Sequence, residues 1–467
     1  MTLSLKQVEL TNWSKSTHSA CLVYPVRDLA GILEVFELAR AGGYSVIPHG
    51  AGHSYTDAAL NTGGVVLDLT PMRRILSWNP QQGVMCVEPG VTLQDMIQVA
   101  WKDGWWPVVT PSTPSVTIGG CTAMNVNGRN AFKCGPFGAN ILSLDIVLPS
   151  GELRTLSPAQ EHNLFHAFVG SLGLLGVTTS ITLQLQPLAS GQVAVRRHSA
   201  AALEQIFAIF AQEEERSDFM EAWLDGFAMH DQLGRGHVTC ATFSSSGQLT
   251  TTPFLSSIHP TSLEEFVFNM GATLVRPVLL PGVKMANQLN FWWGNRLKEQ
   301  RDHLRNIIPY TFWPEPAFAA YHAIFTPGVE TFQAFVPQEN APYVFEQLLH
   351  YSQQHGCSPL WCIIKRHRRD PFLLSYQVDG FSLELNYARS AHSTQQLLPV
   401  LQHMIAIVID AGGRFYLAKD HYQTAAQYRQ SIGDQTVETF LQFKQQFDPH
   451  LQLQSDLFRR LFQPAVR

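Results

Sequence analysis

A glycine-rich turn and a longer loop of small residues most constrain what this chain can fold into. The turn reads Pro48-His-Gly-Ala-Gly-His-Ser-Tyr55, and the loop runs from Thr113 to Gly128 with adjacent glycines at 119 and 120. Small residues let the backbone approach a ligand closely and point its N–H groups at it, which is a common way to hold a pyrophosphate. The two segments together predict a dinucleotide cradle made by two separated loops.

The two most common nucleotide-binding motifs are missing from the sequence. No G-x-G-x-x-G follows a strand pattern, and no glycine-rich loop ends in the lysine of a P-loop. A dinucleotide held between two separated loops points instead to flavin. H-E-x-x-H and G-x-S-x-G are absent too, so we expect neither a metal site nor a serine hydrolase.

The order and spacing of the loop motifs resemble the FAD-binding domain of the vanillyl-alcohol oxidase, or PCMH-type, superfamily. In the second half of the chain, short motifs resemble the decaprenylphosphoryl-β-D-ribose 2′-oxidases and, more weakly, the aldonolactone and alditol oxidases. Each motif is short, and their shared order over residues 20 to 462 carries the resemblance. The motifs are Gly50-Ala-Gly-His-Ser-Tyr55, Ile118-Gly-Gly120, Phe137-Gly138, Ala222-Trp-Leu-Asp225, Leu233-Gly-Arg-Gly236, Phe335-Val-Pro337, Ile364-Lys-Arg366 and Arg414-Phe-Tyr-Leu-Ala-Lys-Asp420.

Length, charge and cysteine content indicate the number of domains, the class of partner and the cellular compartment. A chain of 467 residues is too long for one hydrophobic core and suits two domains. A net charge of −5 without a basic stripe argues against nucleic acid. Seven cysteines without a repeated spacing favour a reducing compartment. With no signal-peptide pattern and no apolar run of membrane length, we expect a cytoplasmic protein without a membrane span.

Periodicity predicts an α+β fold in three segments. Short strands and helices over residues 1–190, including a helix that Asp28 caps, predict a two-lobed FAD-binding domain. Residues 191–412 carry longer alternating strands separated by helices such as 263–270, which predicts a substrate, or cap, domain with an antiparallel sheet covered by helices. By resemblance, residues 413–467 return to the FAD-binding domain.

His53 lies, by resemblance, where covalent members of the superfamily link a histidine to the flavin 8α-methyl carbon. The ribose 2′-oxidases carry arginine there and bind FAD non-covalently, so His53 could instead donate to the pyrophosphate. We expect the covalent link. The FAD contacts that we expect are His53, Gly50, Ala51, Gly52, Ser54, Tyr55, Thr113, Thr117, Ile118, Gly119, Gly120, Cys121, Asn125, Gly128, Phe137, Gly138, Val177 and Lys419.

Lys419 is the first candidate catalytic residue. It follows an apolar run at 404–409 and a turn at 411–413, so we expect it on or just after a strand. By resemblance it matches the lysine shared by the ribose 2′-oxidases and the aldonolactone oxidases. Such a lysine could stabilise reduced flavin and orient the alcohol, or act as a base if burial lowers its pKa.

Two further candidate catalytic residues, Lys365 and Glu384, belong to predicted strands. Lys365 interrupts the apolar run 360–366 and therefore needs a partner or a ligand. Alternation places Ser382, Glu384 and Asn386 on one face of a single strand. The resemblance also places Tyr55 at the substrate site. The five expected substrate contacts are therefore Tyr55, Lys365, Ser382, Glu384 and Asn386.

The resemblance implies an FAD-dependent oxidoreductase that oxidises the CH–OH group of a sugar-like or polyol-like alcohol by hydride transfer to flavin N5. Two alternatives stay open: a flavin-dependent C=C reductase of the Δ24-sterol reductase type, and the flavin subunit of a two-protein epimerase with a short-chain reductase partner. The identity of the alcohol is beyond the sequence.

Overall fold

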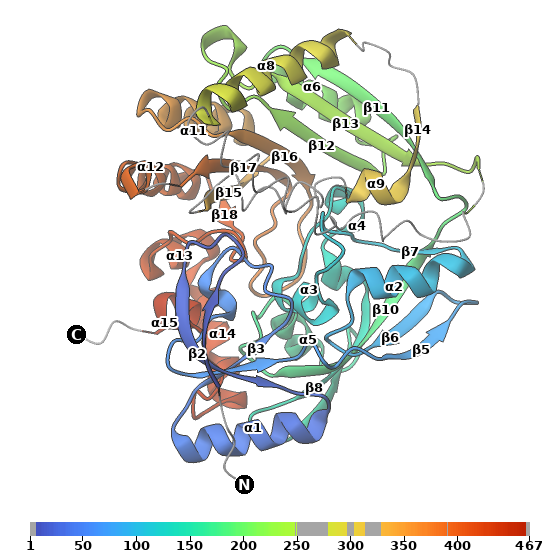
Figure 1. The fold of residues 1–467 in the computed structure, drawn as a ribbon, viewed down its shortest axis with the longest axis vertical. Coiled ribbons are helices and arrows are strands. Elements are labelled where there is room, and N and C mark those ends of the chain that lie inside the picture. Colours follow the sequence, from blue (N-terminus) through green and yellow to red (C-terminus); the bar gives the residue numbers. More distant parts are fainter. Residues whose placement is uncertain are drawn as a thin grey trace.

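The computed structural model describes residues 6–247, 249, 279–296, 303–312, 328–389 and 391–463 of the chain. Within these residues the strands form three sheets, two in the lower half of Figure 1 and one in the upper half. Helices and antiparallel strands alternate along the chain, so the fold is α+β as predicted. The helix predicted over residues 263–270 lies outside the described residues.

The first sheet has the strand order β1-β2-β4-β3, in which β4 runs parallel to both β2 and β3. Helix α1 (Leu29–Gly42) covers it with an apolar face. As predicted, the Asp28 carboxylate caps α1 by accepting from the Gly31 N–H at 3.0 Å, and Gly43 ends it with φ 70°. The strands are β1 (Lys6–Thr11), β2 (His18–Pro25), β3 (Val46–His49) and β4 (Val65–Asp68).

The second sheet is antiparallel and has the order β5-β6-β10-β8-β9, with β7 paired to β10. Its strands are β5 (Ile75–Asn79), β6 (Val84–Val87), β7 (Trp105–Pro107), β8 (Ile141–Val147), β9 (Leu153–Leu156) and β10 (Val177–Pro187). The helices between them are α2 (Leu93–Ala100), α3 (Ile118–Met124), α4 (Ala131–Cys134) and α5 (His162–Phe168).

The third sheet is antiparallel throughout and has the order β14-β11-β13-β12-β16-β17-β15-β18. Its strands are β11 (Gln192–Ala200), β12 (Phe219–Leu224), β13 (Gly236–Phe243), β14 (His303–Asn306), β15 (Val329–Pro337), β16 (Trp361–His367), β17 (Gly380–Ala388) and β18 (Arg414–Phe415). The associated helices are α6 (Leu203–Glu213), α8 (Leu279–Arg296), α9 (Ile307–Thr311), α11 (Ala341–Gln354) and α12 (Ala391–Asp410).

The two faces of the third sheet differ in chemistry because side chains alternate along each strand. On one face, Phe381, Leu383 and Leu385 of β17 join a core that α6, α11 and α12 complete. The opposite face carries the polar residues of the same strands, among them Glu384 and Lys365. The covered face anchors the sheet, and the other face is available for a site.

The C-terminal segment contains α13 (Ala425–Ile432), α14 (Asp434–Phe447) and α15 (Asp456–Leu461), and it contacts elements of all three sheets. α15 contacts the turn at residues 57–59, α14 contacts α5, and α13 contacts α12 and β18. Leu453 forms a parallel bridge to Val46 at the start of β3. Lys444, fully buried, donates to the carbonyl of Leu174 at 2.7 Å and to Asp448 at 2.6 Å. Burial lowers the pKa of Lys444 to about 8, although Asp448 opposes this shift.

Candidate active site

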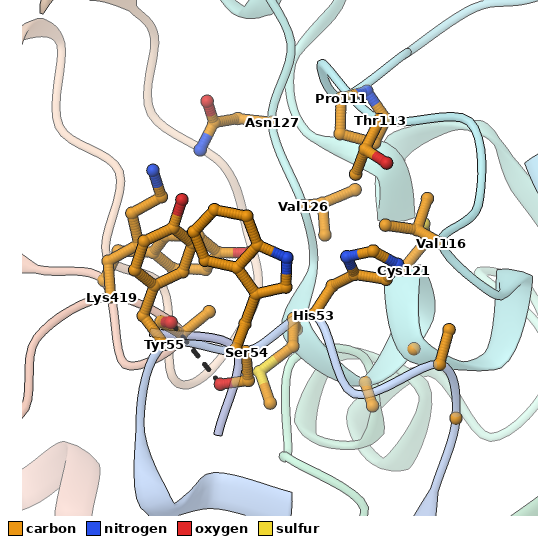
Figure 2. A pocket seen from close by; sticks show the side chains of 18 of the residues that line it. His53, Ser54, Tyr55, Pro111, Thr113, Val116, Cys121, Val126, Asn127 and Lys419 are labelled. Atoms are coloured by element: carbon orange, nitrogen blue, oxygen red, sulfur yellow. Dashed lines mark hydrogen bonds between the residues drawn. The ribbon is translucent and has the colours of Figure 1, made fainter. Parts of the chain in front are cut away.

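A cavity of about 1330 Å³, counted with its open mouth, lies between the polar face of the third sheet and the glycine-rich loops. Figure 2 shows Tyr55 beside Lys419, with His53 nearer the loop that carries Thr113 and Val116. Fourteen of the predicted site residues line this cavity. They are Gly50, Ala51, Gly52, His53, Ser54, Tyr55, Thr113, Thr117, Gly120, Cys121, Gly128, Lys365, Glu384 and Lys419.

The turn after β3 presents an uninterrupted row of backbone donors. Among the described residues, no acceptor is within hydrogen-bond distance of the N–H groups of residues 50 to 54, nor of those of Ser112 and Thr113. Unpaired successive N–H groups along a cavity form an anion-binding concavity, which suits a pyrophosphate. This row of donors fits the dinucleotide predicted from the sequence.

Glycine is required at position 50 by the close approach of the second loop. A Cβ atom there would lie 2.2 Å from the Thr117 Oγ1 atom. That hydroxyl oxygen caps α3 by accepting from the Gly120 N–H at 3.3 Å. The two loops therefore meet through one threonine, and any side chain at position 50 would push them apart.

Six predicted FAD contacts lie behind the cavity wall. Asn125 ends α3 with φ 45°, and its side-chain oxygen accepts from the Gly138 N–H at 2.9 Å. A Cβ atom on Gly119 would lie 2.7 Å from the side chain of Pro89. The six residues, all buried except the half-buried Gly119, are Ile118, Gly119, Asn125, Phe137, Gly138 and Val177.

His53 is neutral at physiological pH. Burial lowers its pKa to about 4. Its Nε2 atom lies 3.0 Å from the Ser115 hydroxyl, which in turn lies 3.0 Å from the Thr113 hydroxyl. The second loop therefore orients this imidazole through two hydroxyl groups, and the ring presents an unprotonated nitrogen instead of a cation.

Lys419 lies in the turn just after β18, as predicted, and the apolar run before it forms the end of α12. Its turn is bonded to the first loop, because the Ala418 carbonyl accepts from the Tyr55 N–H at 2.8 Å. The Lys419 Nζ atom lies 4.5 Å from the centre of the Tyr55 ring, a cation–π distance. Trp13 also packs against that ring, with 4.5 Å between the ring centroids.

Glu384 accepts a hydrogen bond of 2.8 Å from the Lys419 ammonium group. Burial alone would raise the pKa of Glu384, but the charges of Lys419 and Lys365 and the hydrogen bonds from Lys419 and Asn386 lower it below its usual value. Glu384 is therefore a carboxylate at neutral pH. The structure thus pairs an ionised acceptor with a cationic donor at the cavity surface.

The rest of the polar strand face contributes unequally. Asn386 donates to Glu384 at 3.3 Å, and the Ser382 hydroxyl bonds to the buried His367 at 2.8 Å. Both residues lie beside the cavity wall without lining it. Of the three alternating residues, Glu384 alone reaches the cavity.

Lys365 and Arg129 flank Glu221 of β12. The Lys365 Nζ atom lies 3.5 Å from one Glu221 oxygen, and the Arg129 Nε atom lies 3.2 Å from the other. Both cations line the cavity, whereas Glu221 lies behind them. A chain of alternating charges therefore runs along the sheet from Lys419 to Arg129.

Besides Gln333, which the resemblance marks as a weaker substrate candidate, several residues line the cavity without having been predicted, among them Trp13, Arg129 and Tyr416. Trp13 comes from the turn between β1 and β2, and no local motif marks it. Arg129 directly follows the second loop, so a basic residue after Gly128 was the available signal. Gln333 lies opposite Glu384 in the register of β15 and β17, which only strand pairing reveals.

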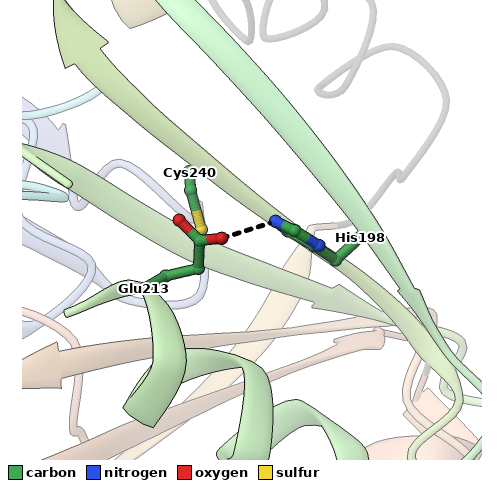
Figure 3. Close-up of side chains that lie close together, drawn as sticks. All are labelled: His198, Glu213 and Cys240. Carbon is green, nitrogen blue, oxygen red and sulfur yellow. Dashed lines mark ion pairs between the residues drawn. The ribbon is translucent and has the colours of Figure 1, made fainter. Parts of the chain in front are cut away.

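A second group of ionisable side chains lies in the third sheet, away from the cavity. Figure 3 shows His198, Glu213 and Cys240 close together, with 2.9 Å between His198 and Glu213. Arg196 and Arg216 also pair with Glu213, and burial raises the pKa of the Cys240 thiol to about 12. A carboxylate held by two guanidinium groups beside a protonated thiol is a structural ion-pair network, not a donor set for a metal.

The helices within the described residues include none that is long and apolar enough to cross a membrane.

Comparisons with known proteins agree with the geometry. Residues 20–157 match the FAD binding domain family. The whole chain is similar to a decaprenylphosphoryl-beta-D-ribose oxidase of Mycolicibacterium smegmatis, with 26% identity over 97% of both chains. A D-lactate dehydrogenase of Anaerostipes hadrus is 31% identical over 33% of this chain and 34% of its own length. Cytokinin dehydrogenase 10 of Oryza sativa subsp. japonica is 31% identical over 34% of this chain and 30% of its own.

Proposed function

Because this chain is an FAD-dependent oxidoreductase with a PCMH-type FAD-binding domain, we propose that it oxidises the CH–OH group of a sugar-like or polyol-like alcohol. One observation carries the proposal: the ionised Glu384 and the cationic Lys419 meet at 2.8 Å on the cavity surface. Removal of a hydride from a carbinol carbon also requires an acceptor for the hydroxyl proton. Glu384 and Lys419 supply an acceptor and a donor for one hydroxyl group.

The residues that would hold FAD are those of the two loops. The N–H groups of residues 50 to 54, which have no partner among the described residues, suit its pyrophosphate, and Thr113, Thr117 and Gly120 of the second loop line the same cavity. Bound FAD supplies the hydride acceptor, at flavin N5, for an oxidation of this kind. The chain's own contribution is the orientation of the alcohol and the transfer of its proton.

In the proposed reaction, Glu384 accepts the hydroxyl proton of the substrate as its carbinol carbon becomes a carbonyl. Lys419 donates to the same oxygen and holds Glu384 ionised between turnovers. Tyr55 and Trp13 provide an aromatic wall next to Lys419, against which the C–H face of a sugar can pack. The hydride and the proton together account for the two-electron oxidation.

We also propose that FAD is covalently attached through His53. The neutral state of this imidazole supports the proposal, because only an unprotonated ring nitrogen can form the bond. The hydrogen bond between Ser115 and His53 Nε2 fixes the ring orientation. The second interpretation, donation to the pyrophosphate, would gain from a charged imidazolium, which burial disfavours here.

An absorption spectrum before and after acid precipitation tests the covalent attachment. We expect a yellow protein whose flavin stays with the acid pellet, and a His53→Ala variant that releases its flavin into the supernatant. Complete release of flavin from the wild-type protein would refute the covalent bond and leave the oxidoreductase assignment intact.

Anaerobic mixing tests the reaction itself. We expect an alcohol substrate to bleach the flavin and NADPH to leave it oxidised. Bleaching by NADPH instead would favour the C=C reductase. The names of the relatives support neither that alternative nor the flavin subunit of an epimerase with a reductase partner. Those relatives are an oxidase and two dehydrogenases by name.

A further inference from the structure

Lys365 is a largely buried ammonium group that makes no hydrogen bond to the part of the chain that the structure describes. Its side chain is 14% exposed, and its nearest carboxylate oxygen, on Glu221, lies 3.5 Å away. No hydrogen bond joins its Nζ atom to any other described residue. An ammonium group has three donors, and leaving them unsatisfied in a largely buried position costs free energy. Lys365 therefore has donors to offer to a ligand in the cavity that it lines.

Arg129 has donors to spare at the same end of the cavity. Its Nη1 atom donates to the Tyr310 carbonyl at 2.9 Å, and its guanidinium group stacks on the Tyr310 ring at 5.2 Å. Among the described residues, its Nη2 atom has no acceptor. The side chain is only 9% exposed, so the Tyr310 contacts fix the guanidinium plane beside the cavity.

The charges around this end of the cavity do not balance. Among the described residues, the charged side chains that line the cavity are those of Arg129, Lys365, Lys419 and Glu384. Glu221, behind Arg129 and Lys365, supplies the second carboxylate. Three cations against two carboxylates leave one positive charge, and His53 adds none because it is neutral. A desolvated excess charge is costly unless a ligand of opposite sign neutralises it.

Gln333 gives an independent sign that a ligand belongs here. It lines the cavity and is 3% exposed, yet its side-chain oxygen has no hydrogen-bond partner among the described residues. Buried amide groups are nearly always hydrogen-bonded, so this one awaits a donor such as a hydroxyl group. It lines the cavity from β15, which pairs with the strand of Glu384 on the side away from Lys365, so the ligand that it awaits extends past Glu384.

We propose that Arg129 and Lys365 form an anion-binding subsite, and that the alcohol oxidised by this protein carries a carboxylate or phosphate group. The proposal rests on the proposed function, which it narrows to acidic sugars, polyols and hydroxy acids. Arg129 offers its Nη2 donors, which have no acceptor among the described residues, and Lys365 adds a point charge. Glu221 acts as a positioning residue that holds the two cations side by side.

Binding to the FAD-loaded protein tests the subsite with three matched six-carbon probes. These are D-glucitol, which is neutral, D-gluconate and D-glucitol 6-phosphate. Titration calorimetry and perturbation of the flavin spectrum report their affinities without turnover. We expect at least one anion to bind about tenfold or more tightly than D-glucitol, with a preference that falls as salt is raised. The tighter of the two anions identifies carboxylate or phosphate as the natural group.

Variants separate this subsite from a general effect of charge. We expect Lys365→Met and Arg129→Met each to lower the affinity for the preferred anion about tenfold or more, while the affinity for D-glucitol changes less than twofold. Lys365→Arg should recover most of the lost affinity. The exposed Lys102 serves as the control, since Lys102→Met should change neither the affinity for the preferred anion nor that for D-glucitol. Melting temperatures and flavin content of each variant show whether it is folded and loaded.

Two results would overturn the subsite. One is that neither anion binds better than D-glucitol to the wild-type protein. The other is that the two methionine variants weaken the binding of D-glucitol as much as that of the anion. Both differ from failure of the proposed function, in which the anions bind but no alcohol reduces the flavin.

Discussion

The two walls of the cavity recognise ligands in different ways. The wall of glycine-rich loops offers backbone N–H groups, and the His53 ring that lines it is neutral. The wall of the third sheet offers charged side chains that pair with one another across three strands and a turn. A backbone wall suits a cofactor common to many enzymes, whereas a side-chain wall can be changed one residue at a time to suit a substrate.

The comparison predicts that changes in the side-chain wall alter the reaction and changes in the backbone wall alter flavin content. The largest effect should come from Lys419. We expect Lys419→Met to keep its flavin but to lower the rate of flavin reduction by on the order of 10² or more, because it removes both a positioned donor and the partner of Glu384. Stopped-flow reduction by a reactive alcohol measures this rate, and a rate within a few-fold of wild type would contradict the assignment.

Glu384→Gln isolates charge from shape in the same wall. We expect kcat/KM to fall by the equivalent of about 1.5–3 kcal/mol, the range for a hydrogen bond to a charged group. The flavin spectrum should barely change, because Glu384 lies on the sheet and not on the glycine loops. Steady-state kinetics with Glu384→Asp as a second variant show whether a shorter carboxylate restores part of the activity. An unchanged kcat/KM in the glutamine variant would show that Glu384 does not bind the substrate hydroxyl.

Asp420 follows Lys419 in the chain and is fully buried. It tests whether burying an ionisable group next to the side-chain wall lowers the free energy of unfolding. Burial raises its pKa to about 6, despite the opposing charge of Arg460. The folded state therefore holds this proton more tightly than the unfolded state, and wild-type stability falls as pH rises from about 4 to about 6. We expect Asp420→Asn to remove that loss, with a gain relative to wild type on the order of 2 kcal/mol above pH 6 and little gain at pH 4. Chemical denaturation at several pH values measures it, and a gain independent of pH would contradict the mechanism.

Gly50→Ala should give the smallest effect, and it should appear in flavin content. The added methyl group would displace the Thr117 hydroxyl from its cap on α3, at a cost of about 1 kcal/mol. We expect a few-fold lower flavin content, measured as the ratio of flavin to protein absorbance. Gly282→Ala, where the new methyl group meets no atom within 4 Å, is the matched control. Equal flavin content in both variants would argue against close contact between the two loops.

The backbone wall could be predicted from the sequence because its signals are local. Glycines at 50, 52 and 120 mark the loops, and the capping residues Asp28 and Thr92 mark the first two helices. Alternation along residues 380–388 also placed Glu384 on the polar face of its strand. Each of these features depends on residues that are close in the chain.

The pairings in the side-chain wall could not be predicted, because they join distant segments. Glu221 meets Lys365 only through the pairing of β12 with β16, and Arg129 reaches Glu221 from the loop between α3 and α4. Trp13 reaches Tyr55 from a turn with no motif of its own. Ser382 shares the polar face as predicted, yet its hydroxyl is bonded to His367 and does not reach the cavity.

The bond between the Tyr55 N–H and the Ala418 carbonyl joins residues more than 360 positions apart. Leu453 lies later still in the chain, and it bridges to the strand that leads into the same loop. During synthesis the ribosome must therefore release nearly the whole polypeptide before the first loop acquires its supports. The loop that is translated early is completed late, so nascent chains that stop short of Ala418 lack the support for stable capture of the flavin.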